Sequence, residues 1–126
     1  MCLICDRIEL IKAGENPYFV KELETGYVVI GDHQYFEGYT LFLAKEHVTE
    51  LHHLHPTVKF RFLEEMSLVQ EAVSKAFDMK GHGLNGRGPV WWVPWEEMVA
   101  EEYHVKDRRL ENLIATLSET LNQIVK

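Results

Sequence analysis

Two cysteines near the start of the chain have a spacing that can do chemistry. Cys2 and Cys5 form a C-x-x-C pair, and the sequence holds no other cysteine. Thiols at this spacing bind metal ions, act as a redox pair, or stay reduced in a protein interior. Redox catalysis is the least favoured of these, because no thioredoxin-like βαβ pattern surrounds the pair. A structural disulfide is disfavoured in the reducing compartment that the rest of the sequence indicates.

Seven histidines offer further reactive groups. Three of them are clustered: His52, His53 and His55. The cluster comes just before Pro56, which suits the first turn of a helix, so we interpret it as a polar surface connection. His82 and His104 are isolated and are expected to face solvent. A G-x-G-x-x-G string at 81–86 lacks the preceding strand and the following helix of a dinucleotide fingerprint, which favours a loop.

The composition is typical of one globular domain spanning residues 1–126. Hydrophobic residues make up 46% and charged residues 26% of the chain, which is ordinary for a packed core. The net charge of −7 disfavours nucleic acid as a partner, because binding to its backbone needs clustered cations. No apolar run approaches the length of a membrane span, and the first residues lack a signal-peptide pattern. We therefore expect a cytoplasmic protein that does not bind membranes.

The hydrophobic pattern predicts an α+β fold. Two extended runs, Tyr18–Leu23 and Tyr27–Ile30, are joined by a short turn containing glycine, as in a hairpin. Tyr39–Ala44 is a third strand, and its apolar residues predict cover on both faces. A helical turn over Asp6–Lys12 precedes the strands, and an apolar stripe at helical spacing predicts a long helix from Pro56 to Phe77.

Further elements complete this expectation. Gly31–Gly38 reads as a polar and aromatic loop between strands. Pro94–Glu102 predicts a short acidic helix, and a last amphipathic helix starts near Asp107, a plausible N-cap. Its apolar stripe is Leu110, Leu113, Ile114, Leu117, Leu121 and Ile124. Three strands form a small sheet to cover the apolar stripe of the long helix predicted from Pro56 to Phe77. Most sheets have more strands than this.

Several of these segments resemble the bacterial branch of the histidine-triad (HIT) family. The most specific is GYTLFLAKEHV at 38–48, which looks like the family strand ending in a Lys-x-His step. Other matching stretches are CLICDRI at the start, FLEEMSLVQEAVSKAF in the long helix and GPVWW after it. GYTLFLAKEHV lies within a longer matching stretch, ENPYFVKELETGYVVIGDHQYFEGYTLFLAKEHVTELHHL at 15–54, and together the stretches cover most of the chain from Met1 to about Glu102.

The resemblance implies a helix-backed antiparallel sheet of about five strands, a common size, that forms dimers and binds nucleotides. Family members act at a nucleotide α-phosphate through the middle histidine of a His-x-His-x-His strand, which forms a covalent intermediate. Here that strand and the one before it are missing, because Lys80 runs directly into Gly81. The domain is therefore apparently shortened at about residues 78–82, and we predict that it has no catalytic residues.

The resemblance also implies residues that contact a nucleotide. Asp32 falls within one position of an acid that bonds the ribose in the family. His33 lies in the loop that is near the nucleotide. Ile8 and Ile11 line the base pocket by the same comparison, with ordinary core packing as the alternative.

A zinc site is implied in the same way. Some family members hold a structural zinc with such a cysteine pair and the histidine of the Lys-x-His step, which here are Cys2, Cys5 and His47. Zinc prefers four ligands, and the fourth would have been lost with the missing segment, which leaves an open site. A pair of reduced thiols without metal remains the alternative. The tryptophans Trp91 and Trp92 resemble residues that pack in the core or at the subunit boundary.

One main hypothesis and two alternatives follow. The main hypothesis is a HIT-like protein that binds a purine nucleotide and is inactive as a nucleotidyl hydrolase or transferase. The first alternative is an active hydrolase of nucleoside phosphoramidates or dinucleoside polyphosphates with a substitute nucleophile from His33 or the 52–55 cluster. The second is a small metal-binding or oligomerising module. Because the missing strands leave Tyr39–Ala44 as an exposed apolar edge, we expect a homodimer or higher oligomer.

Overall fold

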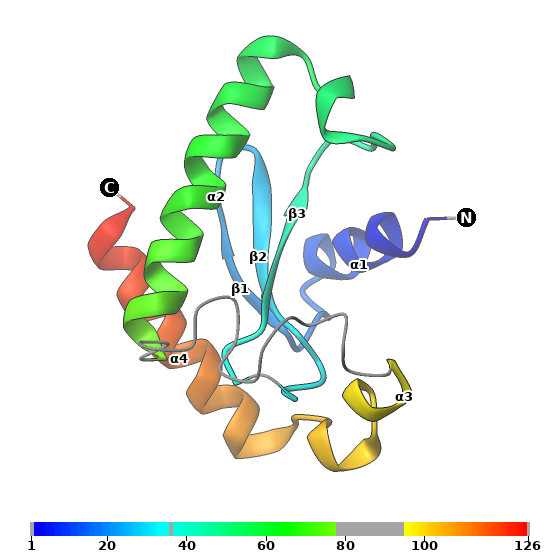
Figure 1. Ribbon diagram of the computed structural model, residues 1–126, viewed down its shortest axis with the longest axis vertical. Helices are drawn as coiled ribbons and strands as arrows, with labels where there is room; N and C mark the ends of the chain where they lie inside the picture. Colours follow the sequence, from blue (N-terminus) through cyan, green and yellow to red (C-terminus); the bar gives the residue numbers. More distant parts are fainter. Residues whose placement is uncertain (1, 36, 78–94, 126) are drawn as a thin grey trace.

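The computed structural model describes residues 2–35, 37–77 and 95–125 of the chain. Its centre is one antiparallel sheet with strand order β1-β2-β3 (Figure 1). The strands are β1 (Phe19–Glu22), β2 (Gly26–Ile30) and β3 (Thr40–Ala44). Because β2 pairs with both neighbours, the predicted hairpin and third strand are confirmed, as is the α+β class.

Helices precede and follow the strands in the described residues. They are α1 (Leu3–Lys12), α2 (Pro56–Ala76), α3 (Trp95–Met98) and α4 (Asp107–Ile124), with 3-10 turns at Leu51–His53 and Glu101–Tyr103. α1 begins earlier than predicted because Cys2 caps it, its Sγ accepting a hydrogen bond from the Cys5 N–H at 3.2 Å. The acidic helix expected over Pro94–Glu102 is divided between α3 and the second 3-10 turn. Asp107 is the first residue of α4, and the N-cap is Lys106.

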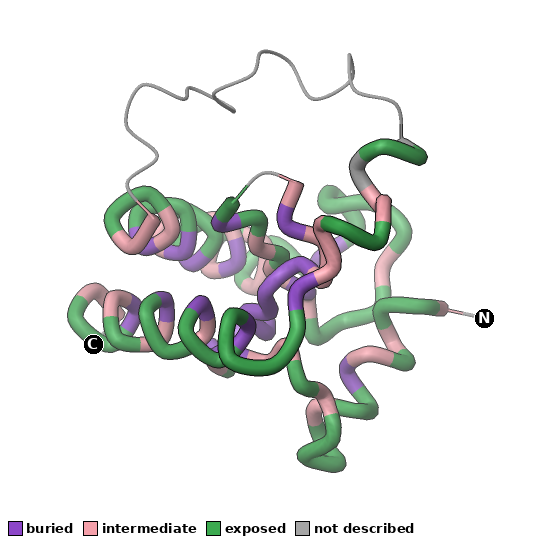
Figure 2. The backbone as a smooth tube through the Cα atoms, turned by 90° about the horizontal axis from the view of Figure 1, so that it is seen from below, coloured by how far each residue is buried: buried purple, intermediate pink, exposed green. Residues whose placement is uncertain are grey.

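The elements form three layers with the sheet in the middle. α2 and α4 pack together on one face of the sheet, and α1 lies on the other (Figure 1). In Figure 2 the buried residues of α2 and α4 lie on the sides that these helices turn toward each other. The predicted stripe of α4 is confirmed, since Leu110, Leu113, Leu117 and Leu121 are all buried. These leucines share one core cluster with Val20, Val28 and Ile30 of the sheet.

β3 is covered on its two faces to different extents. On the α2 face, the Phe42 ring stacks on Phe62 with ring centroids 4.9 Å apart. On the α1 face, Leu43 is buried beside Ile8, whereas Leu41 stays 39% exposed. The prediction of cover on both faces is therefore wrong for the half of β3 that α1 does not reach. Among the described residues β3 is an edge strand of the sheet, and Leu41 is an exposed apolar residue on it.

One carboxylate is buried where α2 meets the hairpin. Glu65 is 1% exposed, and it accepts hydrogen bonds from the Glu24 N–H at 3.0 Å and from the Thr25 N–H at 2.8 Å. The Thr25 hydroxyl donates to it as well, at 2.5 Å. Arg61, one helical turn earlier, places a guanidinium nitrogen 3.6 Å from the same group. Glu65 therefore accepts the hydrogen bonds that the turn between β1 and β2 donates, and in this way it joins the hairpin to α2.

Some of the sequence predictions lie outside the described residues. They are the shortened junction at 78–82, the glycine string at 81–86, His82, Trp91 and Trp92.

Replacement of Glu65 tests how much the hairpin depends on it. We expect Glu65→Ala to lower the free energy of unfolding by about 2–4 kcal/mol, because two backbone N–H groups and a hydroxyl lose their acceptor. Urea denaturation followed by circular dichroism measures this loss. The neighbouring Glu64 is exposed and forms a surface ion pair with Arg61, so Glu64→Ala should cost less than about 1 kcal/mol. Equal losses in the two variants would contradict the assigned role.

Candidate functional site

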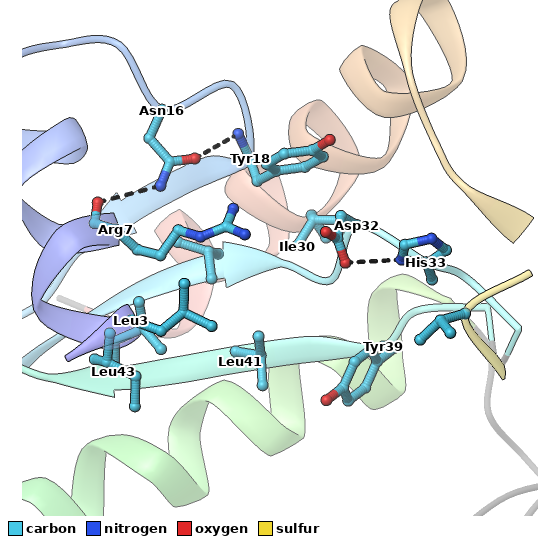
Figure 3. A pocket seen from close by; sticks show the side chains of 13 residues that line it. Leu3, Arg7, Asn16, Tyr18, Ile30, Asp32, His33, Tyr39, Leu41 and Leu43 are labelled. Atoms are coloured by element: carbon cyan, nitrogen blue, oxygen red, sulfur yellow. Dashed lines mark hydrogen bonds and ion pairs between the residues drawn. The ribbon is translucent and has the colours of Figure 1, made fainter. Parts of the chain in front are cut away.

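A cavity of about 330 Å³ lies on the α1 side of the sheet, where β2 ends and β3 begins. This volume falls within the range of small-molecule sites. Its sheet surface is apolar and comprises Val29, Leu41 and Leu43, of which Leu41 and Leu43 are labelled in Figure 3. These residues share a face because side chains alternate along a strand, and Val29 lies directly opposite Leu41 in the register.

α1 supplies a second wall of the cavity. Leu3, Ile4 and Arg7 line it, and their spacing of three and four residues places them on one side of the helix. Arg7 extends toward Tyr18 and Ile30 (Figure 3). Within the described ranges its guanidinium has no ion-pair partner, so the cavity contains a cation that is not neutralised by a neighbouring side chain.

Asn16 ties α1 to the start of the sheet. Its amide nitrogen donates to the Arg7 carbonyl oxygen at 3.3 Å, and its carbonyl oxygen accepts from the Tyr18 N–H at 2.9 Å. Both Asn16 and Tyr18 line the cavity. The Asn16-Pro17 turn that follows α1 therefore also positions two polar groups of the site.

The opposite end of the cavity carries an acid and an imidazole. Asp32 and His33 both line it, and the Asp32 carboxylate lies 3.1 Å from His33 Nδ1. The loop that holds them is shaped by buried Gln34, whose amide donates to the Gly31 and Tyr39 carbonyl oxygens at 2.8 and 2.9 Å. Gln34 also accepts from the Gly38 N–H at 2.7 Å. These hydrogen bonds hold the described residues of the Gly31–Gly38 loop in place without a regular element.

His104 joins this end of the cavity from the far part of the chain. Its ring contacts the His33 ring edge-on, with centroids 5.1 Å apart, and its Nε2 lies 3.3 Å from the Tyr18 hydroxyl. The backbones pair too, since the Val105 N–H donates to the Asp32 carbonyl oxygen at 2.8 Å. His104 is half-buried by these contacts, so the prediction that it faces solvent is wrong.

The charges of the cavity act on Tyr18 in opposite directions. Burial raises the pKa of Tyr18 most, the Asp32 carboxylate raises it further, and the Arg7 guanidinium lowers it. A phenol of ordinary pKa, about 10, is already protonated at neutral pH, and the net rise in the pKa of Tyr18 moves it further from ionisation. Tyr18 therefore acts as a hydrogen-bonding group of the cavity and not as an anion.

A candidate metal centre lies at the start of α1. The two sulfur atoms of Cys2 and Cys5 and a ring nitrogen of His47 all lie within 4.8 Å of one another, a grouping that can hold a metal ion. Cys5 Sγ and His47 Nδ1 are 3.1 Å apart. His47 follows β3, so the cluster connects the first turn of α1 to the segment after that strand.

The two thiols differ in acidity. The pKa of Cys2 is lowered to about 7, first by the Cys5 thiol, then by the Cys5 backbone N–H, and to a smaller extent by His47. The pKa of Cys5 is raised, because it donates to Cys2 and is partly desolvated, with nearby acids adding to the rise. The thiolate of the pair therefore forms first at Cys2, the helix cap.

The residues predicted to bind nucleotide are placed in two different environments. Asp32 and His33 line the cavity. Ile8 is 6% exposed and belongs to the core cluster behind the cavity floor, with Ile11 packed against the same cluster. Sequence reasoning missed Arg7, Tyr18 and His104. The spacing of four residues between Leu3 and Arg7 could have placed Arg7 on the same side of the helix as Leu3. Nothing in the local sequence links Tyr18 to His104.

The histidine cluster before α2 lies apart from this cavity. His52, His53 and His55 are all exposed, as expected for a surface connection. The His52 and His53 rings contact each other at 4.4 Å between centroids, and His55 Nδ1 accepts from the Thr57 N–H at 3.3 Å as the N-cap of α2. The described contacts of this cluster are therefore structural.

Comparisons of the chain with protein-family models, curated proteins and solved structures find no match. The resemblance to the HIT family thus depends on the stretches of sequence quoted above. Among the described helices, none combines the length and apolar character needed to cross a bilayer.

Thiol alkylation tests the acidity of the cysteine pair. In protein dialysed against a chelator, the iodoacetamide reaction of Cys2 should be half-maximal near pH 7, because the thiolate is the reactive form and the pKa of Cys2 is about 7. Cys5 should react only at higher pH. Mass spectrometry of the N-terminal peptides distinguishes the two sites.

The Cys5→Ala variant supplies the matched control. It removes the strongest hydrogen bond to the Cys2 sulfur, so the pKa of Cys2 should rise by more than in His47→Ala. Identical pH profiles for Cys2 in wild type and Cys5→Ala would show that the hydrogen bond does not set its acidity.

Proposed function

We propose that this protein is a HIT-like domain that binds a purine mononucleotide in the cavity beneath α1 and lacks the nucleophile needed to hydrolyse it. The cavity joins three chemically different surfaces, and this combination carries the proposal. An apolar floor suits a base, an acid at one end suits sugar hydroxyls, and an unneutralised arginine suits a phosphate.

The apolar surfaces support the site for the base. Val29, Leu41 and Leu43 form a flat strand surface, and Leu3 and Ile4 face the same space from α1. Burial of a planar aromatic ring between such surfaces removes apolar area from water, which stabilises the complex by about 25 cal/mol per Å².

Asp32 and Arg7 support the sites for the polar parts of the ligand. The Asp32 carboxylate is 41% exposed at the cavity, so a lone pair stays available for a sugar hydroxyl although His33 occupies one side. The Arg7 guanidinium presents a fork of donors that matches the geometry of phosphate oxygens. A neutral Tyr18 beside it adds a hydrogen-bonding group without repelling the anion.

The sequence supports binding without turnover. No His-x-His-x-His string occurs in the chain, and the described cavity contains one lining histidine, His33. Its Nδ1 faces a carboxylate, and its ring packs edge-on against His104. A covalent nucleotidyl intermediate needs an imidazole nitrogen directed at phosphorus with flanking groups that stabilise the oxyanion. We therefore expect no measurable phosphoramidate hydrolysis.

Calorimetric titration with matched ligands tests the proposal. Wild type should bind AMP more tightly than 2′-deoxy-AMP and adenosine. Asp32→Asn should remove the preference for ribose, and Arg7→Met should remove the preference for the phosphate. Each loss should be about tenfold or more, because a charge-assisted hydrogen bond contributes roughly 1.5–3 kcal/mol.

Two exposed residues outside the cavity provide controls. Glu37→Gln changes an acid on the loop of Asp32, and Lys12→Met changes a cation on the helix of Arg7. Both variants should bind as wild type does. Absence of AMP and GMP binding would refute the proposal, and brisk release of AMP from an adenosine phosphoramidate would favour the active-hydrolase alternative.

A second candidate function is zinc binding at Cys2, Cys5 and His47. Two thiolates and one imidazole suit zinc, whose ligands in a tetrahedral site stand about 3.5–3.8 Å apart. The three donor atoms already lie within 4.8 Å of one another, so small side-chain movements bring them to that spacing. A bound ion would neutralise the thiolates and hold the start of α1, with Leu3 and Ile4, over the cavity.

Competition with a chromophoric zinc chelator tests this second function. Wild type should bind one zinc ion, and Cys5→Ser or His47→Ala should weaken binding at least about tenfold, because each removes one of three protein ligands. His52→Ala changes an exposed histidine outside the cluster and should bind as wild type. Unchanged affinity in His47→Ala would exclude the proposed ligand set.

A further inference from the structure

β3 has a free edge among the described residues. Its other edge pairs with β2, as the hydrogen bonds just beyond the strand show: the Gly31 N–H donates to the Tyr39 carbonyl oxygen, and the Lys45 N–H donates to the Thr25 carbonyl oxygen, both at 2.9 Å. The direction of the backbone N–H and C=O groups alternates from one residue of a strand to the next. Leu41 and Leu43 therefore direct their N–H and C=O groups toward β2, as Tyr39 and Lys45 do. The backbone N–H and C=O groups of Thr40, Phe42 and Ala44 therefore point away from the sheet.

The two edges of the sheet differ in protection. β1 ends the sheet with a register shift between Phe19 and Lys21 and carries the charged pair Lys21 and Glu22. Bulges and charges of this kind prevent strands of other molecules from adding to an edge. β3, with the sequence TLFLA, has neither a charge, a proline nor a bulge. An unprotected apolar edge favours pairing with another strand.

We propose that this edge pairs with the same edge of a second copy, antiparallel and about a two-fold axis that passes beside Phe42. Opposed residues in an antiparallel pair must both direct their backbone groups inward, and Thr40, Phe42 and Ala44 meet this condition. A register centred on Phe42 uses all three, since Phe42 faces its equivalent and Thr40 faces Ala44 of the partner subunit. A shift centred on Leu41 or Leu43 leaves one residue at each end unpaired.

The side chains fit this register on both faces. On the α1 face, Leu41 comes to lie opposite Leu43 of the partner subunit, which covers a side chain that is 39% exposed in the single chain. On the α2 face, the two Phe42 rings lie side by side across the axis. Met66, one turn after Phe62 on α2 and 43% exposed, extends the apolar surface next to this edge. An isologous contact needs such self-complementarity, which favours a second copy over an unrelated partner.

The pairing has a consequence for the cavity. Leu41 and Leu43 also line the cavity, so a partner subunit would place its own Leu41 beside the floor of the site. Two cavities would then lie on the same face of one continuous sheet, related by the axis. This inference does not depend on which ligand the cavity binds.

Sedimentation equilibrium of two variants at one position tests the inference. Wild type should sediment at twice the chain mass of 14.7 kDa. Ala44→Pro removes an N–H that points away from β2 and should weaken dimerisation at least about tenfold, since each copy loses a hydrogen bond across the axis. Ala44→Val keeps that N–H and should dimerise as wild type. Circular dichroism checks that both variants fold. If Ala44→Pro does not fold, Leu41→Lys is the substitute, because it places a charge on the edge strand and should weaken dimerisation.

Cross-linking tests the register itself. In a Cys2→Ser, Cys5→Ser background, Phe42→Cys should form a disulfide between copies, because residues opposed on the axis have Cα atoms about 5.5 Å apart. Leu41→Cys should not, since its equivalent lies two residues further along the partner strand and beyond about 7 Å. A monomeric wild type, undiminished association of Ala44→Pro and Leu41→Lys, or cross-linking at Leu41 in preference to Phe42 would overturn the proposal.

Discussion

The buried carboxylate of Glu65 is the constraint on which the arrangement of the sheet depends. A carboxylate in a core is costly unless its oxygens are fully hydrogen-bonded. Here the donors come from the tight turn of the hairpin, where the buried Thr25 N–H would otherwise lack an acceptor. The two requirements satisfy each other only when α2 lies at one position along the hairpin. Apolar packing alone would tolerate small shifts of α2 along the sheet, whereas this bonding does not.

The position of the hairpin determines the floor of the cavity. β2 is buried along its whole length, with Val28 and Ile30 facing α2 and α4 and Val29 facing α1. The cavity exists because α1 covers only part of that second face, over Tyr27 and Leu43, and leaves Leu41 beyond its reach. Arg7 and Asp32 then stand at its margins on elements held by separate hydrogen bonds, through Asn16 for α1 and through Gln34 for the loop. The site is thus preorganised by side chains that do not themselves need to contact a ligand.

The same strand serves the cavity and the open edge. Odd-numbered residues of β3 turn their side chains to the cavity and their backbone groups to β2, while even-numbered residues turn their side chains to α2 and their backbone groups outward. A change at Leu41 therefore acts on the cavity and on the proposed pairing, whereas a backbone change at Ala44 acts on the edge and leaves the cavity lining unchanged. Ala44 thus makes the proposed association accessible to experiment separately from ligand binding, although both use five adjacent residues.

Local pattern in the sequence was sufficient for the elements of the fold. Alternation predicts the three strands, helical spacing predicts α2 and α4, and the C-x-x-C spacing identifies two of the three members of the metal cluster. The absence of a His-x-His-x-His string is likewise a property of the sequence alone. Such features can be read because each depends on residues that are near one another in the chain.

Tertiary structure alone decided which distant residues meet. Tyr18 and His104 are 86 positions apart and share a hydrogen-bonding contact, and Glu65 reaches a turn about forty positions earlier. How much of β3 is buried on the α1 side also depends on where α1 lies, and the pattern of apolar residues along β3 does not predict that position. Periodicity reports the environment on each side of an element, but the partner that supplies this environment is selected by packing and by the pairing of buried polar groups. For this reason the sequence by itself determined the secondary-structure elements and the absence of a His-x-His-x-His string, and the fold decided the cavity and which edge of the described sheet stays open.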